Sequence, residues 1–424
     1  MITKLTIAPG VTLRALQTDK FKTGCFSINF LRQHNKENAA LDALLPSVLL
    51  RGTEKYPNIQ QISMQLDKLY GATFGSLVRR KGEAKLFGFY GDFLEDCFVP
   101  GGGIFAGMLE FLDQILFHPI TEEEKECFLP EYVEGEKQNL IRALESSIND
   151  KRSYAYQAML QTMCAEEDYG VPRLGTVEDV ESITPDRLWD HYQDTLRRCS
   201  IEIFYSGRLS PKDAAAAFAS LFPFRHGVLW ETFSTSRPIM PYEPREVIET
   251  MDVSQGKLVM GMRINMAPED PGFIALNLLN IVFGSGMTSK LFVNVREKHS
   301  LCYYASSTYE RYKGIFVISS GIASENYEIA KTAILDELEA CKRGEITSEE
   351  LEAARIQMLS ALRTAMDVPN RLDDFFVGQA IAPIADLQTQ MEVVKKLTVR
   401  DLSDAAKKLH LDTIYFLKGE NHEH

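Results

Sequence analysis

The sequence lacks several features that would place it in familiar protein classes. Its seven cysteines are dispersed over 424 residues, and no two have Cys-x-x-Cys spacing. This pattern argues against a disulfide framework and against a cysteine zinc site. The most apolar segments, such as residues 273–283, are far shorter than the ~20 residues that a membrane-spanning helix needs. Basic residues are also in deficit, with a formal net charge of −13, which argues against nucleic acid and anionic membranes as partners.

The beginning of the chain gives no sign of export. Residues 1–20 alternate between apolar and polar side chains and lack the continuous apolar stretch of a signal peptide. Dispersed cysteines are also compatible with a reducing compartment. We therefore expect a cytoplasmic protein.

What is present is an ordinary globular composition, with 45% hydrophobic and 25% charged residues. The length alone predicts about two to four domains. Short motifs of the first half recur in the same order in the second half, which narrows this range. The clearest correspondences are Leu49-Leu50-Arg51-Gly52 with Ile281-Val282-Phe283-Gly284, Ile120-Thr121-Glu122-Glu123-Glu124 with Ile346-Thr347-Ser348-Glu349-Glu350, and Ile203-Phe204-Tyr205-Ser206-Gly207 with Tyr415-Phe416-Leu417-Lys418-Gly419. We predict two homologous domains, residues 1–222 and 247–424, joined by a proline-bearing linker at 223–246.

Each half has the same predicted order of elements. A strand (25–31; 257–264) precedes two helices (38–50 and 59–69; 272–283 and 289–297) and a hairpin (72–91; 303–321). A further helix follows, and then a long helix that begins at the Ile-Thr-x-Glu-Glu element, where Thr121 or Thr347 and a Glu three residues later form a capping box. Hairpins segregated from helices predict an α+β fold with mainly antiparallel sheets.

Two stretches resemble a known family. They are Leu50-Arg51-Gly52-Thr53 followed by Leu69-Tyr70-Gly71-Ala72, and Gly284-x-Gly286-Met287-Thr288-Ser289-Lys290-Leu291-Phe292 followed by Val295-Arg296-Glu297-Lys298-x-x-Leu301-x-Tyr303. Both are similar to motifs of the M16 metallopeptidases, the pitrilysin and mitochondrial-processing-peptidase family, and specifically to an inactive bacterial branch. The resemblance covers nearly the whole chain. It implies a clamshell of two homologous domains with the LuxS/MPP-like metallohydrolase fold.

The residues that carry catalysis in that family are absent here. Active members hold zinc with His-x-x-Glu-His on one helix and a Glu on a later helix, and the motif's Glu is the general base. The corresponding positions are Ala43, Pro46 and Ser47, with Ala143 at the third ligand. No two of the eight histidines stand four residues apart. The resemblance therefore implies a degenerate site without catalytic residues, metal or cofactor, and zinc is expected only in a catalytic partner.

Substrate-contacting positions of the family are better preserved. By resemblance, Arg296 and Tyr303 contact a bound peptide; the alternative is an Arg296–Glu297 surface pair and a packed hairpin tyrosine. Gly284 and Gly286 correspond to a glycine-rich loop that either serves turn geometry or faces substrate. Phe74 lies in the segment that, in the family, captures peptides by strand addition, at a position where Asn is usual.

These features favour a non-catalytic subunit that binds a peptide or unfolded segment beside an M16 paralogue with an intact motif. The resemblance also points to a link with modification of elongation factor P. The alternative is a homodimeric peptide-binding or scaffold protein with no peptidase partner. We expect neither nucleic acid nor membrane as a partner.

Overall fold

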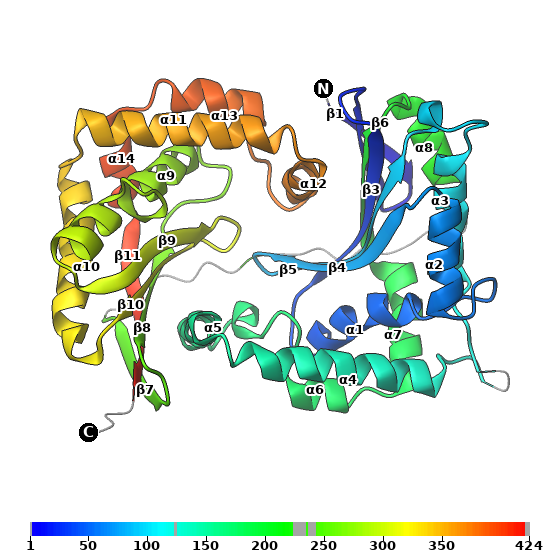
Figure 1. Cartoon of the computed structure of the whole chain (residues 1–424), viewed down its shortest axis with the longest axis horizontal. Coiled ribbons are helices and arrows are strands. Elements are labelled where there is room, and N and C mark those ends of the chain that lie inside the picture. The colour runs from blue at the N-terminus through cyan, green and yellow to red at the C-terminus, as the bar shows by residue number, and fades with distance from the viewer. Residues whose placement is uncertain (1, 123–124, 224–234, 236–242, 420–424) are drawn as a thin grey trace. The chain divides into compact units, whose positions relative to one another are not determined.

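A computed structural model describes residues 2–122, 125–223, 235 and 243–419, and the chain divides into two compact units (Figure 1). Unit 1 comprises Met1–Glu145, Val171–Ser234 and Pro369–Ile381, and unit 2 comprises Ser146–Gly170, Thr235–Val368 and Ala382–His424. Each half of the chain thus contributes one segment to the unit formed mainly by the other half. The predicted boundaries contain no such exchange, because an amphipathic pattern does not reveal which sheet a helix covers. Most of the predicted linker lies outside the described residues, and its last two positions already belong to strand β7.

Six strands form the sheet of unit 1, in the order β1-β2-β6-β3-β5-β4. Their bounds are Ile2–Ala8 (β1), Val11–Gln17 (β2), Thr23–Gln33 (β3), Thr73–Lys81 (β4), Ala84–Leu94 (β5) and Ser200–Gly207 (β6). Strands β2 and β6 pair in parallel, and the other neighbours are antiparallel. The central strand β3 alternates with period two: Phe26, Ile28 and Phe30 enter the apolar core, so Ser27 and Asn29 point to the opposite face.

Helices cover both faces of this sheet. They are α1 (Ala39–Leu49), α2 (Ile59–Lys68), α3 (Ile104–Phe117), α4 (Pro130–Ser147), α6 (Val177–Glu181), α7 (Pro185–Arg198), α8 (Pro211–Ala219) and α12 (Pro369–Gly378). The core lies between the sheet and α1, α3, α7 and α8. The exchanged helix α12 lies on the opposite face, where Asp373 accepts hydrogen bonds from Ser27 and from Nη1 of Arg79 (2.7 Å), and Phe376 stacks on Phe204. The polar side of β3 thus provides the binding surface for α12.

The sheet of unit 2 has five strands in the order β7-β11-β8-β10-β9. They are Arg245–Met251 (β7), Gly256–Ile264 (β8), Cys302–Glu310 (β9), Ile315–Ile322 (β10) and Leu409–Gly419 (β11). Strands β7 and β11 are parallel, and the other pairs are antiparallel. If β1 is set aside, this order repeats that of unit 1 strand for strand. The predicted α+β fold of two homologous domains with mainly antiparallel sheets is confirmed.

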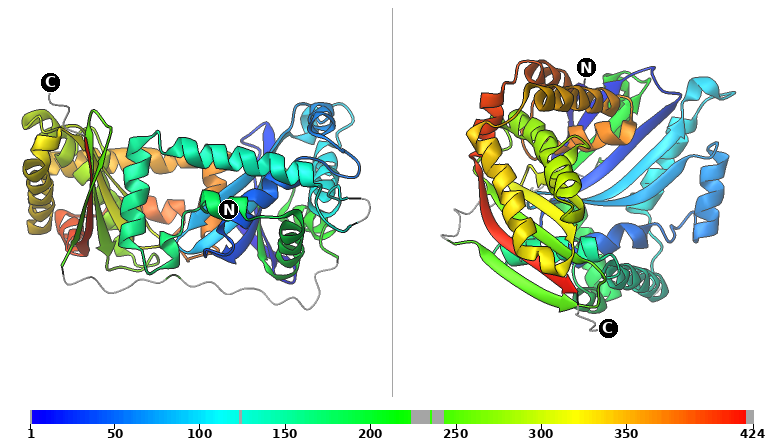
Figure 2. Two further views of the ribbon diagram at one scale, coloured as in Figure 1. Left: turned by 90° about the horizontal axis from the view of Figure 1, so that it is seen from below. Right: turned by 60° about the vertical axis from the view of Figure 1, so that its left-hand side comes forward.

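The helices of unit 2 also lie on both faces of its sheet (Figure 2, left). They are α5 (Lys151–Met163), α9 (Gly272–Asn280), α10 (Tyr327–Arg343), α11 (Ser348–Ala365), α13 (Leu387–Val394) and α14 (Val399–Ala406), with π-helical segments at Ile281–Ser285 and Leu291–Lys298, and 3-10 turns at Asp168–Gly170 and Ser324–Asn326. The main core lies under α9, α10, α11 and α14. The exchanged helix α5 packs on the other face, against Val259, Val317 and Tyr415. None of the helices within the described ranges is both long and apolar enough to cross a membrane.

The two predicted capping boxes have different outcomes. Thr347 and Glu350 exchange both capping hydrogen bonds at the start of α11 (3.1 and 2.8 Å). The matching prediction at Thr121 is wrong, because Thr121 forms a β-bridge to Phe128 and α4 begins only at Pro130; Glu124 lies outside the described residues. Phe128 is buried against Trp189, and this packing overrides the local helix signal.

Candidate functional site

Helix α1 carries three of the four positions predicted to be degenerate. It is apolar nearly all round, so that Ala43 and Pro46 are buried and Ser47 is half-buried. Pro46 lies inside the helix and has no N–H to donate to the preceding turn, a change that costs about 3 kcal/mol in an ordinary helix interior. The side chains of Ala43 and Pro46 have no donor atom, and Ser47 has only a neutral hydroxyl. These residues are poor zinc ligands compared with imidazole and carboxylate groups.

The fourth position, Ala143, is exposed on α4 and also has no donor side chain. The Glu136-Lys137 pair one heptad earlier fastens α4 to its surroundings. Arg51 Nη1 lies 3.3 Å from Glu136 Oε1, and Lys137 Nζ donates to the carbonyl oxygens of Glu181 and Ile183. Among the described residues, no group of three or more His, Cys, Asp or Glu side chains could hold a metal ion. The residues present do not fit zinc, and no catalytic step follows from them.

A buried ionic cluster lies directly beside these positions. Asp42 precedes Ala43 and is fully buried, and its Oδ1 lies 2.8 Å from Nε2 of His191. Arg32 Nη1 lies 3.1 Å from His191 Nδ1, and Arg32 Nη2 donates to Asp194 Oδ2 (2.7 Å). The His191 tautomer with its proton on Nε2 satisfies both ring contacts. Asp42 and His191 are 149 residues apart in sequence, so only the fold brings them together.

Lys85 adds a second buried cation near α1. Its Nζ donates to the carbonyl oxygens of Ala39 and Arg173. Burial lowers the pKa of Lys85 to about 7, although the Asp42 carboxylate acts in the opposite direction. No motif in the sequence predicts this cluster. Its only sequence signal is a set of charged residues within strands and helices that are otherwise apolar.

In unit 2, the predicted substrate residues lie on and beside one π-helical segment. The Arg296 guanidinium lies 4.6 Å from the Phe292 ring, and its Nε lies 3.6 Å from Glu297 Oε1. Tyr303, at the start of β9, has 70% of its surface exposed. Each of the two alternatives predicted for these residues is therefore supported in part. Arg296 forms the predicted surface pair with Glu297, whereas Tyr303 is exposed and remains available to a ligand.

The two glycines of the predicted loop differ in their surroundings. A side chain at Gly284 would collide with Ser307 and Leu291, so a small residue is required there for close packing. Gly286 faces the end of the Gln357 side chain, and the next residue, Met287, is 79% exposed. The Gly284 position therefore serves the fold, while the loop around Gly286 presents an apolar side chain to solvent.

Phe74 lies on β4, an edge strand of the unit 1 sheet. Its ring stacks on Phe89 (5.3 Å between centroids) and meets Phe111 edge-on (5.2 Å). The half-buried side chain therefore packs against the core. Along its free edge this strand offers backbone N–H and C=O groups, of which the Val78 carbonyl already accepts from Arg173 Nη1.

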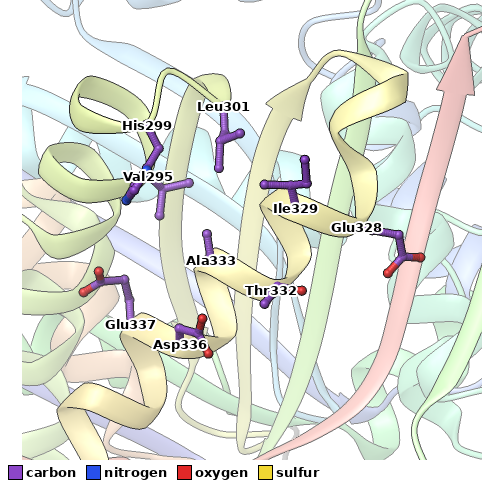
Figure 3. Close-up of a pocket in the computed structure, with 9 residues that line it drawn as sticks. All are labelled: Val295, His299, Leu301, Glu328, Ile329, Thr332, Ala333, Asp336 and Glu337. Carbon is purple, nitrogen blue, oxygen red and sulfur yellow. The ribbon is translucent and has the colours of Figure 1, made fainter.

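A groove of about 530 Å³ lies between Leu291–Lys298 and α10. Figure 3 shows Val295 and Leu301 on one side and Ile329 and Ala333 on the other, with Asp336 and Glu337 at one end. The groove is thus apolar in its middle and acidic at its end. None of the predicted site residues lines it.

Comparison with known proteins places these observations in a family. The family model described as "Peptidase M16 inactive domain" matches residues 182–358. A Bacillus subtilis protein named "Probable inactive metalloprotease YmfF" is 31% identical over 415 residues, which cover 97% of this chain and 96% of that protein. The chain belongs to the M16 family. The predicted resemblance to an inactive bacterial branch is confirmed.

Solved structures agree with this assignment. A conserved protein from Enterococcus faecalis V583 is 28% identical, with a TM-score of 0.92 and full coverage of both chains. A structure described as a peptidase M16 inactive domain from Pseudomonas fluorescens has a TM-score of 0.81 at 18% identity, covering 99% of this chain and 98% of the other, and shows the shared fold. This chain is an inactive M16 peptidase homologue.

Proposed function

We propose that this chain is the non-catalytic, substrate-binding subunit of a heterodimeric zinc peptidase, paired with an M16 homologue that retains His-x-x-Glu-His. The observation that carries the proposal is a contrast within the chain. The metal positions on α1 and α4 hold Ala43, Pro46, Ser47 and Ala143, whereas Tyr303 and Met287 of unit 2 stay exposed as large side chains. Zinc and the general base would then belong to the partner.

The chemistry of the exposed residues suits a peptide ligand. The Arg296 guanidinium is held over Phe292, which leaves its N–H groups able to donate to a carbonyl or carboxylate oxygen. The Tyr303 hydroxyl has no hydrogen-bond partner among the described residues and can donate to a peptide carbonyl. The open edge of β4 can accept an extended segment as an additional strand.

The proposal also covers compartment and pathway. We place the chain in the cytoplasm, and we propose that the heterodimer acts in the modification of elongation factor P. The second part is tested by comparing the mass of that factor, purified from cells with and without this chain. An unchanged modification state would remove the pathway and leave the subunit role intact.

Co-expression with an intact M16 homologue from the same genome tests the subunit role. We expect the two chains to co-purify and to cleave an unstructured peptide at least tenfold faster than the intact homologue alone. Arg296→Ala with Tyr303→Phe is expected to reduce cleavage without loss of pairing. Arg400→Ala serves as the matched control, because that side chain is 90% exposed and lies on α14.

Two outcomes would contradict the proposal. The first is a pair that cleaves peptides no faster than the intact homologue. The second is a stable homodimer with no affinity for the homologue, which would favour a homodimeric peptide-binding or scaffold protein.

A further inference from the structure

Unit 2 contains a cavity that the predicted site residues do not touch. It has a volume of about 370 Å³ and lies between α5 and the β9–β10 hairpin. Its walls carry the hydroxyl groups of Ser306, Thr308 and Ser319, the Gln157 amide, the Arg152 guanidinium and the apolar side chain of Val317. Such a surface is rich in hydrogen-bond donors.

The register of the hairpin explains how the hydroxyls come together. Ser319 of β10 pairs with Ser306 of β9, and Val317 pairs with Thr308. Because side chains alternate along a strand, Ser306, Thr308 and Ser319 project from one face. Ser307 projects from the other, where its Oγ donates to Asn280 Oδ1 (2.7 Å). The hydroxyl row therefore faces α5.

Helix α5 closes over this row at one end only. A side chain at Gly261 would collide with Met159 and Met163, so the second half of α5 lies directly on the sheet. The first turns of α5, which carry Arg152 and Gln157, stand over the serine end of the hairpin and form the cavity wall. The cavity is thus a consequence of packing that is close at one end of α5 and open at the other.

Charge in the cavity is opposite to that of the whole chain. Arg152 Nη2 donates to Ser306 Oγ (2.9 Å), and its guanidinium lies 4.3 Å from the Tyr304 ring. Within the described residues, Arg152 has no carboxylate at ion-pair distance. Lys257 lies near enough for the Arg152 charge to lower its pKa, in addition to the larger effect of burial. The neighbouring Asp150 caps α5 through the backbone N–H groups of Arg152 and Ser153, and its negative charge acts in the opposite direction on the pKa of Lys257.

We propose that this cavity binds a carboxylate group of a peptide ligand. A guanidinium held by an aromatic ring and a serine presents its remaining N–H groups as a planar fork, which matches a carboxylate. The surrounding hydroxyls are neutral donors, suited to one negative charge. The inference rests on the proposed peptide-binding role and names the part of the peptide that this unit recognises. It does not depend on the heterodimer.

Fluorescence anisotropy on the isolated full-length chain tests the proposal. The probes are an N-terminally labelled Gly-Ser-Ala-Leu-Ala with a free carboxyl terminus, its C-terminal amide, and the amide with an internal Glu. We expect the free acid to bind at least tenfold more tightly than the plain amide. Binding of the Glu-containing amide with similar affinity would assign the site to carboxylates in general, and its absence would assign the site to chain ends.

Four variants locate the effect, two as tests and two as controls. Arg152→Gln is expected to abolish the preference for the acid, and Ser319→Ala to reduce it, with unchanged circular dichroism. Asp336→Asn, in the acidic groove of Figure 3, and Arg400→Gln on α14 are the matched controls and are expected to leave it unchanged.

Equal affinity for acid and amide, or an acid preference that survives in Arg152→Gln, would overturn the proposal. So would a preference that changes in Asp336→Asn, or competition by inorganic phosphate at far lower concentration than acetate. If the heterodimer fails while the acid preference stands, only the subunit role is lost. If the preference is absent while Arg296→Ala with Tyr303→Phe still impairs the pair, only this inference is lost.

Discussion

His34 provides a pH-dependent test of how unit 1 is built. Its side chain is fully buried, and its Nε2 lies 3.0 Å from the carbonyl oxygen of Val171 and donates to it. Nδ1 has no hydrogen-bond partner among the described residues. Burial, followed by the charge of Lys85, lowers the pKa of His34 to about 4, from an ordinary value of 6.5.

The sign of the effect follows from proton binding. Between about pH 4 and 6.5 the unfolded chain binds a proton at His34 that the folded unit does not bind. The free energy of unfolding of unit 1 therefore falls as the pH falls through this window. The difference between the ordinary pKa of 6.5 and the pKa of about 4 in the folded unit, at about 1.36 kcal/mol per pH unit, corresponds to a loss of roughly 3 kcal/mol.

Urea unfolding followed by tryptophan fluorescence measures this loss. The chain has two tryptophans, and Trp230→Phe leaves Trp189, which lies in α7 of unit 1 against Phe128. In this background, unfolding free energies are compared at about pH 7 and pH 4 with and without His34→Gln, which keeps a donor near Val171. We expect His34→Gln to remove about 3 kcal/mol of the pH dependence.

The control is His118→Gln in the same unit, where the side chain is 42% exposed and its Nε2 lies 3.3 Å from Asp113 Oδ2; the effect of His34→Gln is measured relative to this variant. An unchanged acid response in His34→Gln would refute the reasoning, because other groups would then account for the whole effect.

Four other predictions address α1, which carries three of the predicted degenerate positions, and the exchanged helix α12. Asp42→Ala should destabilise unit 1 by about 3–5 kcal/mol, because Arg32 and His191 then stay buried without the Asp42 carboxylate. A loss below about 1 kcal/mol in the same urea assay would contradict the stabilising role of this cluster. Pro46→Ala should stabilise unit 1 by about 1–3 kcal/mol by restoring a helical N–H, and a loss of stability would mean that α1 has adapted to proline. Arg79→Ala removes a partner of the buried Asp373 and should increase hydrogen exchange in 369–381 relative to α8, whereas equal exchange would mean that Phe376 alone holds α12. The combined variant Ala43→His, Pro46→Glu, Ser47→His and Ala143→Glu should bind one zinc ion, measured by metal analysis and reversed by chelator; no binding would show that the register is wrong.

Periodicity was enough to predict the general fold, because each half carries its own strand and helix patterns in the same order. The exchange of α5 and α12 could not be predicted in this way. The apolar residues of α5 match the face of β8 around Gly261, and Asp373 of α12 matches Ser27 and Arg79. Both matches depend on surfaces more than 90 residues away in sequence, which a local pattern does not contain.

The candidate site likewise has features that the sequence predicts and features that only the folded structure shows. The absence of metal ligands at Ala43, Pro46 and Ser47 is a matter of residue identity and is visible in the sequence. The cluster of Asp42, His191 and Arg32 and the hydroxyl row facing Arg152 depend on tertiary contacts and strand register. Phe74 illustrates the intermediate case: its strand was identified, but whether its ring faces a ligand or the core is decided by packing against Phe89 and Phe111.

The buried cluster also determines what a rebuilt zinc site would test. In an enzyme whose ligand helix is held by its metal, loss of the ligands frees the helix. Here Asp42 ties the first turn of α1 to His191 and Arg32, and Arg51 ties the segment after α1 to Glu136 of α4. Both ends are therefore fixed without metal, and the positions of Ala43 and Ser47 between them are set in advance. Failure of the fourfold variant to bind zinc would then count against the alignment of Ala143 on α4, rather than against the placement of α1.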